Sequence, residues 1–113
     1  MTINDFLELS GATLLTESVD TQREITCGYS CDLLSWVMSH GASGMAWITV
    51  QTHMNVIAVA TLMDMACVII PENIKVEQDI IEKAGGEDIA LIASAKTAYE
   101  LCGLMYTSGV RAN

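Results

Sequence analysis

The chain has 113 residues, of which 51% are hydrophobic, and this length and composition fit one globular domain rather than two. Fourteen acidic and five basic side chains give a formal net charge of −9, and the basic residues are scattered along the sequence. Binding to nucleic acid or to an anionic membrane surface needs clustered lysine and arginine, so both functions are excluded. Only 17% of the residues are charged and one is a proline, which excludes a disordered chain.

The sequence predicts a cytoplasmic protein. Its first residues include Asp5 and Glu8 and lack the basic start of a secretory signal. The longest apolar runs, residues 56–63 and 65–71, are much shorter than the roughly 20 residues of a membrane-spanning helix. In a cytoplasmic protein the four cysteines are expected to be free thiols or metal ligands rather than disulfides.

The first half of the chain predicts a helix, two short strands, a second helix and a third strand. Apolar residues at helical spacing begin at Ile3, and residues 12–16 and 24–27 then have the pattern of short strands, the second ended by Gly28. Residues 33–39 are expected to form the second helix. The continuous apolar run 45–50 contains β-branched residues and predicts a buried strand.

Helices and strands alternate regularly in the second half. Residues 53–63 predict a helix that is apolar nearly all round and therefore largely buried. The apolar runs 66–70 and 89–93 predict two further strands, separated by an amphipathic helix that Gly85 and Gly86 close. A last helix follows, with an apolar stripe that ends before Gly109. Four polar residues are expected to cap helix starts: Thr2, Asp32, Thr52 and Ser94.

This order of elements predicts an α/β fold. Unbroken apolar strands separated by helices of ordinary length are typical of a parallel sheet with helices on both faces, joined by right-handed crossovers. We therefore expect residues 1–113 to form a single domain around a mainly parallel sheet of about five strands. Because the apolar content exceeds what one small core can hide, we also expect a homo-oligomer, in the simplest case a homodimer.

Two polar segments follow the second and third predicted strands. Ligands of open α/β sheets bind outside the carboxyl ends of the strands, and free backbone N–H groups at a helix start can hold an anion. We expect both segments to open onto one hollow that holds a small polar or phosphorylated metabolite, possibly a nucleotide. The candidate ligand-binding residues are Gly28, Tyr29, Asp32, Gln51, Thr52, His53 and Asn55. The structural alternatives are that Asp32 and Thr52 only cap helices and that Tyr29 only packs in a tight turn.

Cys27, Cys31 and His53 support a second hypothesis, a metal or iron–sulfur site. The two cysteines form a Cys-x3-Cys pair, which differs from the Cys-x2-Cys pairs of most zinc and iron–sulfur proteins. Cys67 and Cys102 fall in a predicted strand and on a predicted buried helix face, so they are interpreted as small core residues.

The sequence contains no complete catalytic motif. None of its lysines belongs to a G-x4-G-K-[S/T] phosphate-binding loop, and no G-x-G-x-x-G or H-E-x-x-H run is present. We therefore expect a non-enzymatic protein with no obligatory cofactor. A third hypothesis is a protein-interaction module that docks a larger metabolic or redox enzyme through an apolar surface including Trp36.

The two polar segments together resemble the stand-alone DRTGG domains. Residues 25–35 (ITCGYSCDLLS) and 47–60 (WITVQTHMNVIAVA) carry the resemblance, which extends over nearly the whole chain to the Thr-Ala-Tyr-Glu start of the last helix at 97–100. The resemblance implies an α/β domain similar to the N-terminal domain of HPr kinase, with a regulatory or ligand-sensing role. Related proteins are sometimes labelled serine kinases, an activity not carried over here because the phosphate-binding loop is absent. The Asp-Arg-Thr-Gly-Gly run that names the family is also absent, and Gln-Thr-His-Met-Asn stands at 51–55 in its place.

Overall fold

Five helices and five strands follow one another along residues 1–113, which a computed structural model describes throughout. In chain order the elements are α1 (Ile3–Ser10), β1 (Thr13–Leu14), β2 (Cys27–Ser30), α2 (Leu34–His40), β3 (Met45–Ile48), α3 (Met54–Leu62), β4 (Cys67–Ile70), α4 (Gln78–Gly86), β5 (Ala90–Ala93) and α5 (Ala98–Thr107). No helix is both long and apolar enough to cross a membrane.

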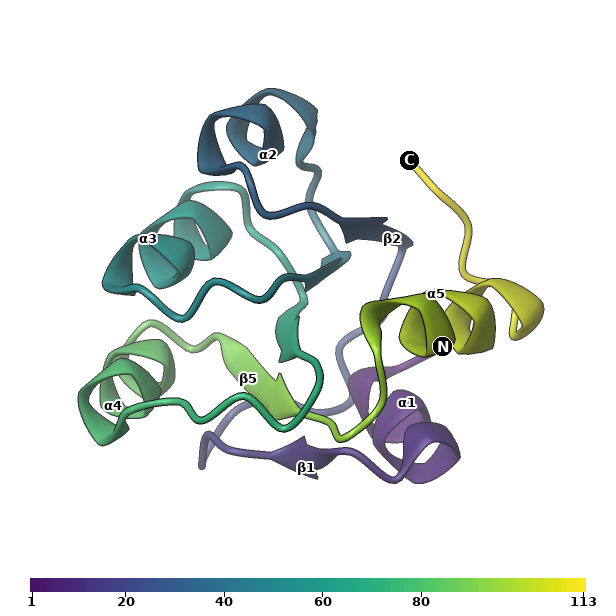
Figure 1. The fold of residues 1–113 in the computed structure, drawn as a ribbon, viewed down its shortest axis with the longest axis horizontal. Coiled ribbons are helices and arrows are strands. Elements are labelled where there is room, and N and C mark those ends of the chain that lie inside the picture. Colours follow the sequence, from purple (N-terminus) through teal and green to yellow (C-terminus); the bar gives the residue numbers. More distant parts are fainter.

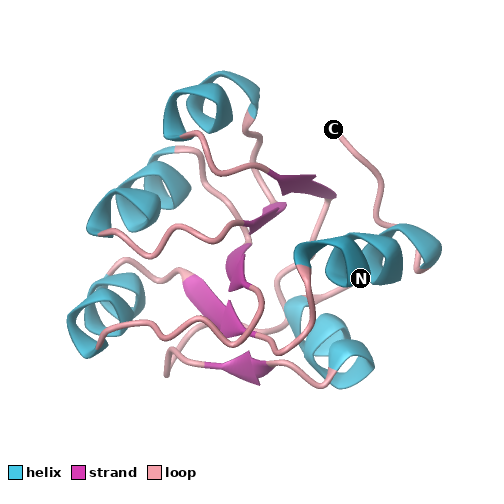
Figure 2. Ribbon diagram, in the orientation of Figure 1, coloured by secondary structure: helices cyan, strands magenta, loops and turns pink.

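The five strands form one sheet in the order β1-β5-β4-β3-β2. Strands β2 to β5 run parallel to their neighbours, and only the short edge strand β1 is antiparallel. Helices α2, α3 and α4 cover one face of the sheet, and α1 and α5 cover the other (Figure 1). Figure 2 shows the resulting three layers, with the strands between two groups of helices. The predicted fold class, a mainly parallel five-stranded sheet with helices on both faces, is confirmed.

Alternating side chains of the central strands feed two separate apolar cores. In β3, Trp47 points toward α2 and α3, whereas Ala46 and Ile48 point toward α1 and α5. Since both faces are covered, every residue of β3 is buried, and the same holds for β4. Strands buried on both sides must be apolar at every position, which is why they appear in the sequence as unbroken apolar runs.

The second strand lies further along the chain than the sequence predicts. It spans Cys27–Ser30 instead of 24–27, and its residues pair in parallel with Met45–Ile48 of β3. Gly28 therefore lies inside the strand rather than ending it. A Cβ at position 28 would lie 3.5 Å from Met105 and Val110, an ordinary packing distance, so the final helix and the tail pack directly over this part of β2.

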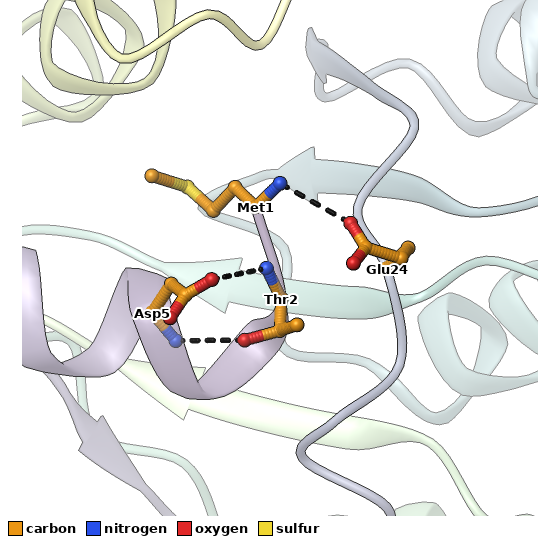
Figure 3. Close-up of polar contacts among 4 residues, drawn as sticks. All are labelled: Met1, Thr2, Asp5 and Glu24. Atoms are coloured by element: carbon orange, nitrogen blue, oxygen red, sulfur yellow. Dashed lines mark hydrogen bonds and ion pairs between the residues drawn. The ribbon is translucent and has the colours of Figure 1, made fainter.

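The start of the chain is held in place by the predicted helix cap. The Thr2 hydroxyl accepts a hydrogen bond from the Asp5 N–H at 3.0 Å, and the Asp5 carboxylate accepts one from the Thr2 N–H at 2.9 Å (Figure 3). The Met1 ammonium group forms an ion pair with Glu24 at 3.2 Å (Figure 3). The segment just before β2 is thereby tied to the start of α1, and Gly11 ends this helix with a left-handed φ of 70°.

The other three predicted caps are wrong. Helix α2 has no side-chain cap, because Asp32 bonds to the loop after β3 instead. The residues that directly precede α3 and α5 are His53 and Thr97, and these supply the caps in place of Thr52 and Ser94. Since a capping side chain must reach the second or third helical N–H, the shift of the helix start by one residue in α3 and by three residues in α5 changes the residue that can act.

Candidate functional site

Asp32 joins the two polar segments at the carboxyl edge of the sheet. One oxygen of its carboxylate accepts a hydrogen bond from the Thr49 hydroxyl at 2.8 Å and another from the Val50 N–H at 2.9 Å. The Gln51 side-chain amide donates to the Asp32 carbonyl at 3.3 Å. Asp32 thus holds the loop after β3 in a fixed position relative to the loop after β2, and its role in the structure is positioning.

Trp47 also connects the loop after β2 to β3, from the buried side of the sheet. Its indole N–H donates to the Cys31 carbonyl at 2.8 Å, and the Cys31 N–H donates to the Ile48 carbonyl at 3.2 Å. Because Trp47 is completely buried in the core under α2 and α3, these two bonds anchor the loop to the rigid part of the sheet.

His53 caps α3 and is exposed at the edge of the sheet. Its Nδ1 atom accepts a hydrogen bond from the Asn55 N–H at 3.1 Å. An accepting Nδ1 carries no hydrogen, so the neutral ring has its proton on Nε2. The cap therefore fixes the tautomer and leaves an N–H donor on the outer side of the imidazole.

Gln51, Thr52 and His53 line a hollow of about 480 Å³ between the starts of α3 and α4. The opposite wall carries the carboxylates of Glu77 and Asp79, which precede and begin α4. Polar residues that precede α3 and acidic residues at the start of α4 thus line the same hollow. A hollow lined in this way can hold a polar molecule that has both hydrogen-bond acceptors and donors.

Gly28 and Tyr29 lie elsewhere. They line a hollow of about 250 Å³ between β2, α5 and the C-terminal tail, where Arg111 also contributes. The Tyr29 ring is stacked with His40 of α2, with ring centroids 6.3 Å apart. Desolvation by the packed surroundings raises the pKa of Tyr29, and the nearby Cys31 thiol adds to this effect.

Asn55, the last candidate, lines a third hollow of about 360 Å³ between α2 and α3. The candidate residues of the first segment, Gly28 and Tyr29, and those of the second segment line different hollows. The arrangement thus differs from the single shared hollow that the sequence suggested. The physical reason is the strand order, in which β3 lies between β2 and β4. The loop after β3 lines a hollow together with the start of α4, whereas Tyr29 of β2 packs toward α2.

The cysteines do not assemble a metal site. No three side chains among the histidines, cysteines, aspartates and glutamates lie close enough to hold a metal ion, so Cys27, Cys31 and His53 do not form a common ligand set. All four thiols are free. Complete burial raises the pKa of the Cys67 thiol to about 12, as expected for a core residue.

Sequence reasoning missed Glu77 and Asp79. Both belong to the polar stretch that opens the fourth helix, where acidic residues are common because they favour the helix dipole. What identifies these two residues is the order of the strands in the sheet. Strands β3 and β4 are neighbours in a parallel sheet, so the segments that follow them meet at one edge.

No protein-family model matches the sequence, and no curated protein matches it. Among solved structures, the fold is similar to the CBS and DRTGG domains of the regulatory region of Clostridium perfringens pyrophosphatase, a structure complexed with the activator diadenosine tetraphosphate. The TM-score is 0.72 at 13% sequence identity, over 95% of this chain and 46% of that one. The present chain thus spans about half the length of its structural neighbour, and the likeness shows the fold.

Proposed function

We propose that this protein is a non-catalytic regulatory domain that senses a small polar or phosphorylated metabolite in the cytoplasm and modulates a partner enzyme. The similar fold in the pyrophosphatase belongs to its regulatory region, and that structure is complexed with the activator diadenosine tetraphosphate, which supports the proposal. Adenine nucleotides are therefore the first ligand class to test. The resemblance of the two polar segments to DRTGG domains points in the same direction.

The hollow between α3 and α4 is the observation that carries this proposal. It lies at the carboxyl edge of a parallel sheet, where ligands of such folds bind. Asp32 fixes the loop that carries Val50 and Gln51 to its wall, and the His53 cap has a donor with a fixed tautomer. A preorganised site of this kind loses little conformational entropy when a ligand binds.

The charges around the hollow restrict the ligand. The carboxylates of Glu77 and Asp79 repel a bare phosphate, but they accept hydrogen bonds from an amino group or from ribose hydroxyls. They also tolerate a magnesium ion that accompanies a polyphosphate. We therefore expect the base or ribose of a nucleotide to lie in the hollow and its phosphates to lie outside it or to carry Mg²⁺.

Thermal unfolding with and without ligand tests the proposal. The probes are AMP, ATP, diadenosine tetraphosphate and acetyl phosphate, each with and without Mg²⁺. A ligand present at about 100 times its Kd stabilises the folded state by roughly 2.7 kcal/mol. For a domain of this size, about 4 °C per kcal/mol makes this a rise in Tm of roughly 10 °C.

Two variants locate the binding site. His53→Ala removes the Nε2 donor and should abolish most of the ligand-induced rise. Tyr99→Ala, on the opposite helical layer at an 89% exposed residue, serves as the control and should keep the full rise. Failure of every probe to shift Tm, or a shift that His53→Ala leaves unchanged, would overturn the assignment of this site.

A further inference from the structure

Helices α2 and α3 present an apolar surface that nothing in the chain covers. Leu62 and Met38 are 69% and 48% exposed beside the groove between these helices. Leu33 and Trp36 are also exposed, but Trp36 lies on the other side of α2, where its ring stacks on that of His40. Between the two helices runs a groove of about 360 Å³ whose lining is apolar except for Asn55. We call this surface the α2–α3 face; its members are Leu34, Met38, Asn55, Ala58, Val59 and Leu62.

The α2–α3 face is also the uncharged part of an acidic protein. No aspartate, glutamate, lysine or arginine occurs from Leu33 to Met63, although the chain as a whole carries a formal charge of −9. The other three helices all carry charges on their outer sides, such as Glu8 on α1, Glu82 on α4 and Glu100 on α5. An amphipathic surface helix normally has a charged outer face, so α3, with exposed Ala58 and Leu62, is built differently.

The charge pattern indicates which partner fits. A basic partner would bind the acidic helices rather than this face. Two copies of this chain repel each other through every charged surface, and the α2–α3 face is where they can approach with the least repulsion. Asp64 at its border is paired with Arg23 at 3.1 Å, which reduces the remaining negative charge there.

The shape of the face also suits contact with itself. In a two-fold contact the same patch serves both partners, so projecting side chains and a groove must occur together. Leu62 and Met38 project beside the groove, and Ala58 leaves its middle open. Asn55 carries both donor and acceptor groups, so two Asn55 side chains can hydrogen-bond to each other across a two-fold axis.

The apolar side chains that line the groove supply only part of the approximately 800 Å² that one partner contributes to a standard interface. The rest of a two-fold contact therefore comes from the uncharged surfaces of α2 and α3 on either side of the groove.

We propose that the α2–α3 face is the interface of a homodimer in which two copies meet across a two-fold axis close to Ala58. The dimer places α2 and α3 of one copy against the same helices of its partner. This inference does not depend on ligand binding, because His53 lines the hollow toward α4 and other residues line the groove.

Analytical ultracentrifugation of the whole chain over a micromolar range tests the dimer. We expect a mass of twice the chain mass of 12.2 kDa. Ala58→Glu brings two like charges together at the axis and should weaken self-association at least roughly 100-fold. Gly103→Glu is the matched control: it adds the same charge on α5, where a side chain meets nothing within 4 Å, and should leave the dimer intact.

A charge-reversal pair makes the test specific to this face. Ala58→Lys should also be monomeric alone, but an equimolar mixture of Ala58→Glu and Ala58→Lys should form a heterodimer. If circular dichroism shows that either variant is unfolded, Leu62→Ser tests the same face at an exposed position. If the wild-type chain is a monomer at all concentrations, the proposal is overturned, and a different protein is then expected to bind this face. Dimers of Ala58→Glu as stable as those of Gly103→Glu would equally overturn it.

Discussion

Replacing Asp32 by alanine tests the link between the two polar segments. In the structure one carboxylate oxygen accepts hydrogen bonds from the Thr49 hydroxyl and the Val50 N–H. Thr49 is only 1% exposed, so water cannot replace the lost acceptor for its hydroxyl, and an unpaired buried donor costs roughly 1–3 kcal/mol. Val50 is 42% exposed, so its N–H can be hydrated at little cost.

We therefore expect Asp32→Ala to lower the free energy of unfolding by about 2 kcal/mol. At about 4 °C per kcal/mol this is a fall in Tm of roughly 8 °C. Asp32→Asn keeps an oxygen in the same place and loses only the charge of the acceptor, so its effect should be about half as large. Urea unfolding followed by circular dichroism measures both variants on the same scale.

A double-mutant cycle with Thr49→Val identifies the cause of the loss. If Asp32 acts through Thr49, the combined variant should be less destabilised than the sum of the single variants by about 1 kcal/mol or more. A helix cap at Asp32, the role that the sequence suggested, would give additive effects. Additive losses, or a loss below about 0.5 kcal/mol for Asp32→Ala, would refute the positioning role.

Two further predictions concern ionisable side chains. Burial raises the pKa of the Cys67 thiol to about 12, so a thiol reagent at mildly alkaline pH should modify the partly exposed Cys31 and Cys102 in the folded protein and leave Cys67 intact, as read by peptide mass spectrometry. The Ser43 hydroxyl, and secondarily Arg23, hold the pKa of Asp64 below its ordinary value of 3.8. A lowered pKa stabilises the fold above that ordinary value and the effect disappears as pH falls through the lowered pKa. The stability gap between wild type and Asp64→Asn should therefore be present at neutral pH and close in acid; a gap that urea unfolding finds constant with pH would contradict this.

The central strands were predictable because a strand that is buried on both faces must be apolar at every position. Strands β3, β4 and β5 contain almost only apolar residues and are separated by helices of ordinary length. Strand β2 was misplaced because Gly28 has the local character of a strand end. Its place is decided by pairing with β3 and by the close packing of Met105 and Val110 over the glycine, which are tertiary effects.

The candidate site was predictable in part for a similar reason. Gln51, Thr52 and His53 stand out because they are polar residues between two buried apolar elements. The role of Asp32 was not predictable from local sequence, since an aspartate before a helix has the same pattern whether it caps that helix or bonds to a loop 17 residues away. Which hollow each residue lines depends on the direction in which loops turn at the sheet edge, and that direction has no sequence pattern of its own.

Both proposals involve helix α3, but the ligand site and the dimer interface use different residues of it. The cap His53 and the first helical residue Met54 border the hollow toward α4, whereas Asn55, Ala58 and Leu62 border the groove toward α2. A helix that packs against the sheet with Val56, Ile57 and Ala60 has its remaining positions divided between those two neighbours. A change at His53 therefore alters a surface that the proposed dimer leaves open, and a change at Ala58 alters one that the proposed ligand does not reach. Loss of ligand response in Ala58→Glu, with His53 unchanged, would show that the dimer and not the single chain forms the binding site.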